Sequence, residues 1–209
     1  MMQHSHPLPA RSVVEPFYFL LVQRCAACGD GPLDACDSRR EFHEGTPCRR
    51  VTAICRACRE KCKFVFDVSA YPDVNEPAAE ALDPIGGPSP SRIIDVSQWL
   101  TLFRTIIRAA DNSKDKSEVR RLGFEAAQCL DEALKFYAKD EELPGEDAFL
   151  SHEAYQLSRE QSGQFTRSRL LSHRDKLPSL DIMRRRLQSA EQPKPAAKSW
   201  WRRGKDHSS

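Results

Sequence analysis

The stretch CAACGDGPL, residues 25–33, holds two cysteines three positions apart, and a second pair follows in CRAC, residues 55–58. The chain has 209 residues and eight cysteines, seven of which lie between residues 25 and 62. One CxxC turn places two sulfurs on the same side of a metal ion, and a second turn brought alongside completes four ligands. The sequence therefore predicts a metal site made by Cys25, Cys28, Cys55 and Cys58.

Four thiolates in a tetrahedron suit zinc, and four protein ligands leave no open position for a catalytic water. The alternative is redox chemistry of the thioredoxin type, in which a CxxC motif opens a helix. The segment GDGP that follows Cys28 starts no helix, and two pairs in one small unit favour a metal over two redox centres. We therefore expect one structural Zn²⁺ ion.

Segments rich in β-branched and aromatic residues flank both pairs and predict short strands. They are FYFLLVQR (17–24), RVTAI (50–54) and KFVFDV (63–68). The two pairs are 26 residues apart, which exceeds the common zinc spacing. We expect the additional residues between the pairs to form a polar loop, DSRREFHEGTP (37–47).

The residue after each pair differs between the two turns. Gly29 follows Cys28 and tolerates the left-handed backbone that turns amides toward sulfur. Arg59 stands at the equivalent place after Cys58, where that conformation should cost roughly 1 kcal/mol. Nearby cations would offset the negative charge of four thiolates: Arg24, Arg56, Arg59 and Lys61.

Two metal-binding turns carried by strands resemble the zinc-ribbon superfamily, over residues 17–68. The resemblance implies a structural zinc ion and says little about a partner. Together with PSRIIDVSQWLTLFRTI (90–106) and AAQCLDEALKFY (126–137), the chain also resembles a bacterial family of uncharacterised zinc-ribbon proteins that have a helical C-terminal half. That second resemblance implies no activity.

Two amphipathic segments, 95–111 and 117–137, predict an antiparallel pair of helices with facing apolar stripes. Asp95 and Gln98 have the spacing of a capping box at the start of the first helix. The expected buried positions are Val96, Trp99, Leu100, Phe103, Ile107 and Ala110 in the first segment and Val119, Leu122, Ala126, Cys129, Leu130, Ala133 and Tyr137 in the second.

These patterns predict an α+β protein in which a small antiparallel zinc ribbon precedes a separate helical region opened by a helical hairpin. Shorter helices are expected at 151–161, 166–177 and 180–190. The expected layout is a disordered N-terminus (1–15), the ribbon (16–70), a Pro-rich linker (71–92), the helical region (93–190) and a disordered basic tail (191–209).

Four potential ligands remain outside the two CxxC pairs: Cys36, Cys48, Cys62 and His43. Their spacings form no metal-binding pair, so we interpret the cysteines as buried or half-buried strand residues. Their use in a thiol-based metal or redox sensor stays open as an alternative.

No motif in the chain indicates an enzyme. HEAYQ (152–156) begins like the HExxH zinc motif but has Gln156 where the second histidine is required. His152 and His173 lie in charged helical segments and are expected to be solvated. We expect a non-enzymatic protein with no catalytic residues.

The formal net charge of +2 implies no general affinity for polyanions, so any such partner must be recognised locally. Six cations lie between residues 49 and 63, and Phe64 and Phe66 follow; strands could present these to nucleic acid. The alternative is that the phenylalanines form the core. We expect a protein partner; the alternative is a nucleic acid bound by these basic strands and the basic tail. Trp200 and Trp201 in the tail are either a partner's contact or merely exposed. The six cations are Arg49, Arg50, Arg56, Arg59, Lys61 and Lys63.

The first residues, MMQHSHPLPARSVVEP, have no apolar core like that of a secretion signal. The apolar run FYFLLV (17–22) is far shorter than the ~20 residues that span a bilayer. We expect a cytoplasmic protein that does not enter a membrane, in a compartment where thiols stay reduced.

Overall fold

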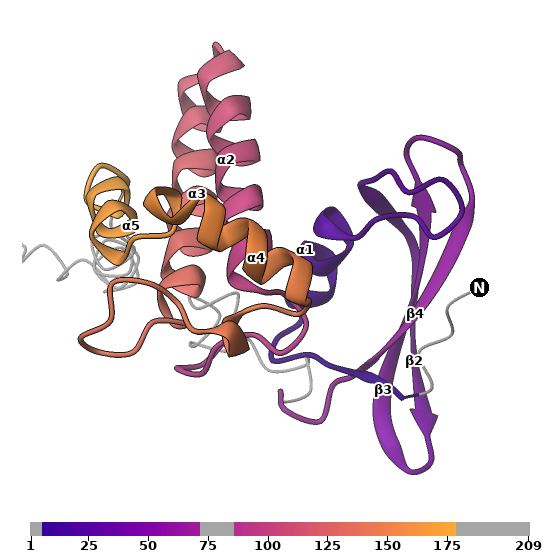
Figure 1. Ribbon diagram of the computed structural model, residues 1–209. Coiled ribbons are helices and arrows are strands. Elements are labelled where there is room, and N and C mark those ends of the chain that lie inside the picture. The colour runs from indigo at the N-terminus through magenta and orange to yellow at the C-terminus, as the bar shows by residue number, and fades with distance from the viewer. Residues whose placement is uncertain (1–5, 72–85, 179–209) are drawn as a thin grey trace, which may run out of the picture. The chain divides into compact units, whose positions relative to one another are not determined.

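The computed structural model of the chain describes residues 6–71 and 86–178 (Figure 1). The chain divides into two compact units, Met1–Ser179 and Leu180–Ser209, and every described residue belongs to the first. In this unit a four-stranded, mostly antiparallel sheet forms in the N-terminal half, and most of the helices follow it. The predicted α+β class is confirmed.

The sheet has the strand order β1-β4-β3-β2. β1 pairs with β4 in parallel, and the other neighbouring strands are antiparallel. The strands predicted at 50–54 and 63–68 are confirmed within β3 and β4. The bounds are β1 (Leu8–Pro9), β2 (Leu33–His43), β3 (Thr46–Cys55) and β4 (Lys61–Asp67).

A long β-hairpin occupies residues 37–47, so the prediction of a polar loop there was wrong. β2 and β3 meet at Glu44 and Gly45, whose φ angles of 50° and 81° match a tight hairpin turn. β2 is an edge strand whose side chains are mostly exposed. A polar sequence therefore suits this strand, because its composition reflects exposure and not the absence of regular structure.

The apolar segment before the first cysteine pair is helix α1 (Glu15–Val22), so the strand predicted at 17–24 was also wrong. A short apolar run cannot be assigned to helix or strand by periodicity alone. α1 covers the sheet: the Phe19 ring lies edge-on to Phe64 and Phe66, with ring centroids 5.4 and 5.5 Å apart. Burial against the aromatic side of the sheet therefore stabilises this segment as a helix.

Helices α2 (Val96–Asn112) and α3 (Lys116–Leu134) are joined by three residues and pack side by side (Figure 1). The predicted capping box is present at the start of α2. The backbone N–H of Gln98 donates to Asp95 Oδ1 at 2.8 Å, and the backbone N–H of Asp95 donates to Gln98 Oε1 at 3.0 Å. These bonds satisfy amides that a helix start leaves without a partner.

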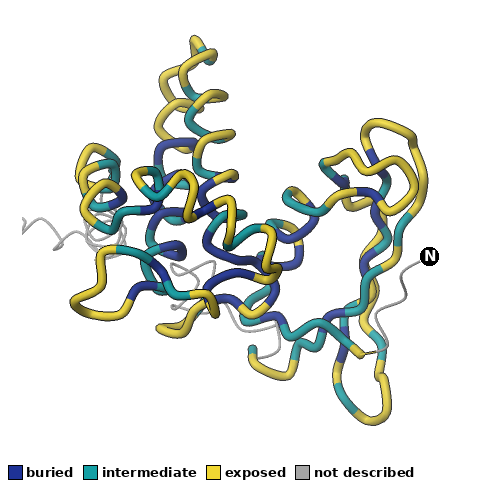
Figure 2. The backbone as a smooth tube through the Cα atoms, viewed as in Figure 1, coloured by how far each residue is buried: buried dark blue, intermediate teal, exposed yellow. Residues whose placement is uncertain are grey.

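Most of the predicted apolar positions of α2 and α3 are buried, including Trp99, Cys129 and Leu130 at 0 % exposure. Four positions are not fully buried, and all of them except the half-buried Phe103 lie toward the connection between the two helices. Ile107 is half-buried and Val119 is 38 % exposed, and Figure 2 shows both helices largely exposed toward that end. The amphipathic pattern thus continues beyond the part of the helices that the core covers.

Two further helices follow the α2–α3 pair, within the segments predicted at 151–161 and 166–177. They are separated by a 3-10 turn, and another precedes them. The elements are η1 (Glu146–Ala148), α4 (His152–Glu160), η2 (Ser162–Gln164) and α5 (Arg167–Arg174). The helix predicted at 180–190 and the tail predicted at 191–209 lie outside the described residues.

One buried core extends from the sheet into the helices. The Tyr18 ring of α1 lies 5.8 Å from the Trp99 ring of α2, and both belong to the apolar cluster that includes Phe66 of β4. The helices were expected to form a separate region after a linker at 71–92. Residues 72–85 of that linker lie outside the described residues, and Ser91 near its end is buried.

A buried network of charges joins the N-terminal segment to α3. Arg11 donates to Glu15 at 2.7 Å and to Glu132 at 2.9 Å, and Lys135 donates to Glu132 at 2.5 Å. Glu15 is 0 % exposed and Glu132 is 2 % exposed. Residues 8–15, which the sequence analysis assigned to a disordered N-terminus, thus supply β1 and two members of this network.

We expect Arg11→Met to lower the free energy of unfolding by about 3–5 kcal/mol, because it leaves the buried carboxylate of Glu15 without its cation and removes one of the two cations of Glu132. Urea denaturation of the full chain, followed by circular dichroism, measures this change. The control Arg39→Met removes the exposed ion pair with Asp37 and should cost less than about 1 kcal/mol. Equal effects in the two variants would contradict a stabilising role for the network.

Candidate metal centre

The four predicted cysteines come together at the end of the sheet where β3 passes into β4. The turn with Cys25 and Cys28 follows α1, and the turn with Cys58 begins at Cys55, the last residue of β3. Leu33, the first residue of β2, pairs with Cys55 in the sheet. This pairing brings the loop that contains the first turn beside the second.

The first turn is closed by two backbone hydrogen bonds. The amide of Gly29 donates to the Cys25 carbonyl at 2.8 Å, and the amide of Cys25 donates to the Asp30 carbonyl at 2.5 Å. Gly29 has a φ of 78°. Its conformation is the left-handed one expected for the residue after the pair.

The second turn repeats the same pattern 30 positions later in the chain. The amide of Arg59 donates to the Cys55 carbonyl at 3.0 Å, and the amide of Cys55 donates to the Glu60 carbonyl at 2.9 Å. Arg59 has a φ of 62°, so it adopts the left-handed conformation in spite of its side chain. The two turns are thus equivalent, and the second contains the strain predicted from the sequence.

The sulfur atoms of Cys25, Cys28, Cys55 and Cys58 all lie within 4.8 Å of one another. The contacts run between the turns: Cys25 Sγ lies 3.6 Å from Cys58 Sγ, and Cys28 Sγ lies 3.7 Å from Cys55 Sγ. A disulfide would require about 2.05 Å. Metal–sulfur bonds of about 2.3 Å in a tetrahedron place sulfurs about 3.8 Å apart. The geometry fits a metal ion held by four thiolates.

Backbone amides point at the sulfurs, a feature that the spacing of cysteines alone did not predict. Amides of Ala27 and Cys28 donate to Cys25 and lower the pKa of its thiol to about 7. The Glu60 amide favours the thiolate of Cys58, but the neighbouring Cys28 and Cys25, together with burial, raise the pKa of Cys58 to about 12. The thiolate of Cys25 thus forms easily, whereas the neighbouring sulfurs keep the proton on Cys58.

The remaining cysteines do not complete a second site. Among the described residues, the cluster of four is the only group of cysteines, histidines and acids that could hold a metal. Cys48 is buried and Cys62 half-buried, as expected, but Cys36 is exposed and donates to the Thr52 carbonyl at 3.4 Å. Burial raises the pKa of the Cys62 thiol, and the nearby Cys25 raises it further.

The histidine of the incomplete zinc motif lies in an exposed environment. His152 Nδ1 is 3.2 Å from Glu146 Oε1, and its Nε2 is 3.1 Å from the Gln156 amide. Gln156 thus contacts the ring at the position where the motif requires a second imidazole. His173 differs from the expectation of a solvated side chain, because it is half-buried against Phe103, with ring centroids 5.7 Å apart.

The cations between residues 49 and 63 do not form one basic face. Arg50 pairs with Glu41 at 2.7 Å, and Arg56 pairs with Asp34 at 2.7 Å. Carboxylates of β2, which the sequence analysis did not place beside these arginines, therefore compensate two of the six charges.

The two phenylalanines that follow these cations lie in the core. Phe66 is 0 % exposed, and Phe64 is half-buried against the same cluster. Strand alternation places both on the face opposite Lys63. The interpretation of these rings as core residues is confirmed, and they are not available to stack on bases beside Lys63.

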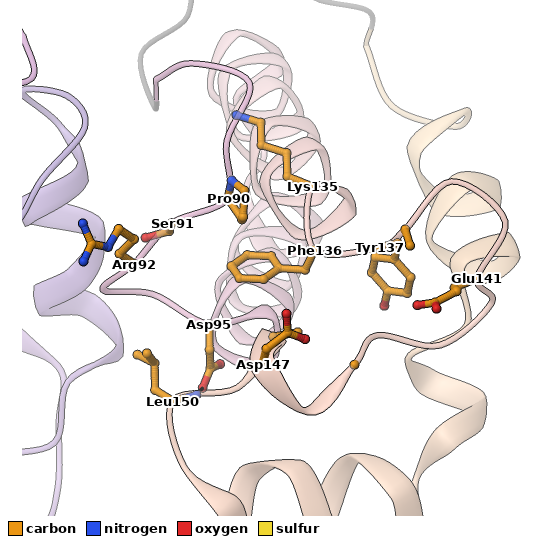
Figure 3. Close-up of a pocket in the computed structure, with 13 residues that line it drawn as sticks. Pro90, Ser91, Arg92, Asp95, Lys135, Phe136, Tyr137, Glu141, Asp147 and Leu150 are labelled. Carbon is orange, nitrogen blue, oxygen red and sulfur yellow. Dashed lines mark hydrogen bonds between the residues drawn. The ribbon is translucent and has the colours of Figure 1, made fainter.

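An open pocket of about 590 Å³ lies between the start of α2 and the segment after α3 (Figure 3). Several of its polar side chains already have partners within the chain. Asp95 caps α2 and also accepts from the Leu150 amide at 3.2 Å, and Tyr137 donates to the Phe165 carbonyl at 2.7 Å. Lys135 donates to a backbone carbonyl at 2.8 Å. These bonds give Asp95, Tyr137 and Lys135 a structural role.

Comparison with protein-family models, with curated proteins and with solved structures finds no match for this chain. Within residues 6–71 and 86–178, no helix has both the length and the apolar character that crossing a membrane requires. The function must therefore be inferred from the four thiols and from the surfaces around them.

We expect Arg59→Gly to raise the free energy of unfolding by about 1 kcal/mol, because glycine adopts the left-handed conformation without strain. Gly29→Ala should lower it by a similar amount through strain alone, since a Cβ added there meets no atom within 4 Å. Urea denaturation at unchanged metal content measures both.

Arg59→Lys is the control for this pair, because it keeps both the Cβ and the charge. It should leave the free energy of unfolding unchanged. Identical stabilities of Arg59→Gly and Arg59→Lys would contradict the interpretation that backbone strain is stored at this turn.

Proposed function

We propose that the protein is a non-enzymatic zinc-binding protein in which one structural Zn²⁺ ion, held by Cys25, Cys28, Cys55 and Cys58, supports an interaction with another macromolecule. The observation that carries this proposal is the arrangement of the four sulfurs, all within 4.8 Å of one another and contributed by two equivalent turns. Tetrahedral coordination by four thiolates is typical of structural zinc.

The absence of an exchangeable ligand position supports a structural role for the ion. Catalytic zinc sites keep one position for water or substrate, whereas four cysteine ligands close the coordination shell. Cys25 and Cys55 are buried while Cys28 and Cys58 are exposed, so the ion would lie at the end of the sheet, partly open to solvent, with a path for loading. This supports a fold-stabilising ion and no catalytic step.

The structure resembles a zinc ribbon around the second turn and differs from one before the first turn. Strands β3 and β4 carry the second turn, as in the ribbon arrangement that the sequence suggested. A helix, α1, and not a strand precedes the first turn. We propose a ribbon-like zinc centre in which the sheet is covered by a helix on one face.

The partner is a second part of the proposal. The sequence favours a protein partner, with nucleic acid as the alternative; a thiol-based sensor is the other hypothesis. The ion pairs of Arg50 and Arg56 weaken the version in which nucleic acid binds the strands. A cytoplasmic location would keep the thiols reduced and able to bind zinc.

Elemental analysis of the purified protein should find one zinc per chain. Because metal binding of this kind supplies about 10–16 kcal/mol of apparent free energy, a strong chelator should unfold the sheet, as seen by circular dichroism. Stoichiometric iron in place of zinc would overturn the identity of the metal. Protein that has no metal and keeps its sheet in chelator would overturn the proposed function.

Cys28→Ser should weaken zinc retention beyond the roughly 10–100-fold that loss of an outer-shell partner typically costs, because it removes a ligand. Competition with a chromophoric zinc chelator measures the difference. Cys36→Ser is the matched control: Cys36 is an exposed thiol outside the four, and its replacement should leave zinc affinity unchanged. Equal losses in both variants would contradict the assignment of ligands.

A further inference from the structure

Helices α2 and α5 bring five basic side chains together around the 3-10 turn η2. Arg104 Nη2 donates to the Gln164 side chain at 2.7 Å, and Arg169 Nη1 contacts the carbonyl of the adjacent Gly163 at 3.4 Å. The contact between the rings of Phe103 and His173 joins the same two helices. We call this group the α2–α5 cationic cluster: Arg104, Arg108, Arg169, His173 and Lys176.

On each of the two helices, the spacing of the basic residues places them on one face. Arg104 and Arg108 are four residues apart on α2, and Arg169 and His173 are four residues apart on α5, so each pair occupies one helix face. Lys176 follows one turn after His173. The four cations Arg104, Arg108, Arg169 and Lys176 are exposed. Two rows of positive charge thus face solvent on neighbouring helices.

Carboxylates do not neutralise this cluster in the described part of the chain. Asp111 on α2 and Asp175 after α5 make no ion pair with its members, in contrast to Glu41 and Asp34, which pair with arginines of the sheet region. Arg174 of α5, which is not a member of the cluster, pairs with Asp131 of α3 at 2.6 Å. Burial lowers the pKa of Arg104, and the positive charges of Arg169 and Arg108 lower it further. The cluster therefore keeps an uncompensated positive field.

We infer that the α2–α5 cationic cluster binds the phosphate backbone of nucleic acid. Guanidinium groups recognise phosphate oxygens through two parallel hydrogen bonds, and three of the four permanent cations are arginines. Contacts to phosphate supply most of the affinity of sequence-independent binding. The cluster would thus position a nucleic acid strand without reading its bases.

An acidic protein surface is the other polyanion to consider, and the apolar residues argue against it. Protein interfaces are depleted in charge at their centre and rely on buried apolar or aromatic contacts. The exposed large apolar residues of the described chain lie on other elements, none of them on α2 or α5. A surface of this composition suits a ligand that is charged along its whole length.

The sequence that follows the described residues is also basic. Residues 179–209 contain eight Lys or Arg against three Asp or Glu. With a formal charge of +2 for the whole protein, positive charge is concentrated in the part of the sequence that follows α5. Such asymmetry between regions is typical of proteins that bind nucleic acid.

This inference deepens the proposed function, because it names the class of partner. It rests on the proposed function only in one respect, that the protein acts by binding another macromolecule. None of its residues belongs to the four cysteines. A failure of nucleic acid binding would leave the zinc proposal standing, and a missing metal would leave the binding measurement interpretable.

The test is fluorescence anisotropy with a labelled 20-base-pair DNA duplex of random sequence and the full-length protein, between 50 and 300 mM salt. We expect the double variant R104Q/R169Q to bind about 30-fold more weakly near 150 mM salt, with a salt slope smaller by about 1.8, because two phosphate contacts are lost. R104K/R169K keeps the charges and should keep most of the slope.

The control R39Q/R50Q removes two arginines of the sheet and should reduce binding far less. Metal content and circular dichroism establish that each variant is folded. Binding that is unchanged in R104Q/R169Q would overturn the inference. So would equal loss in both double variants, or a labelled polyglutamate peptide that binds as tightly as DNA, which would indicate an acidic protein partner instead.

Discussion

Four sulfur atoms within 4.8 Å of one another are the constraint on which the N-terminal part of this structure depends. Four thiolates at such distances would repel one another, so the arrangement suits a cation among them and is compatible with a metal site. The sulfurs belong to two turns that are far apart in sequence. Bringing the turns together fixes the loop after α1 against the end of β3, and the strand pairing of Leu33 with Cys55 continues that contact into the sheet.

Helix α1 is consequently fixed at both of its ends by polar interactions. Near its C-terminus the chain enters the first cysteine turn, while at its N-terminus Glu15 accepts from Arg11, which also donates to Glu132 of α3. Between these ends, Phe19 packs on the aromatic face of the sheet. A helix of eight residues is marginal alone. Its formation here depends on contacts that only the folded protein provides.

The sequence predicted what local spacing determines and missed what distant contacts determine. The CxxC turns, the positive φ at Arg59 and the capping box of α2 each follow from residues a few positions apart, and all are present. The helical state of 17–22 and the hairpin at 37–47 depend on burial and edge position, which a short window does not reveal. The α2–α5 cationic cluster was missed for the same reason. Arg104 and Arg108 of α2 lie more than sixty residues from Arg169 of α5, and the sequence shows only the four-residue spacing within each helix.

Charge illustrates the same principle at the level of function. The chain has 32 basic and 30 acidic residues, so composition alone favours no polyanion. Glu41 and Asp34 of β2 pair with Arg50 and Arg56, whereas Arg104 and Arg108 of α2 and Arg169 of α5 make no ion pair within the described residues. The contact between Tyr18 of α1 and Trp99 of α2 then connects the two parts, since Arg104 follows Trp99 by little more than one turn. A metal that holds α1 on the sheet would thereby support the helix that carries the unpaired cations.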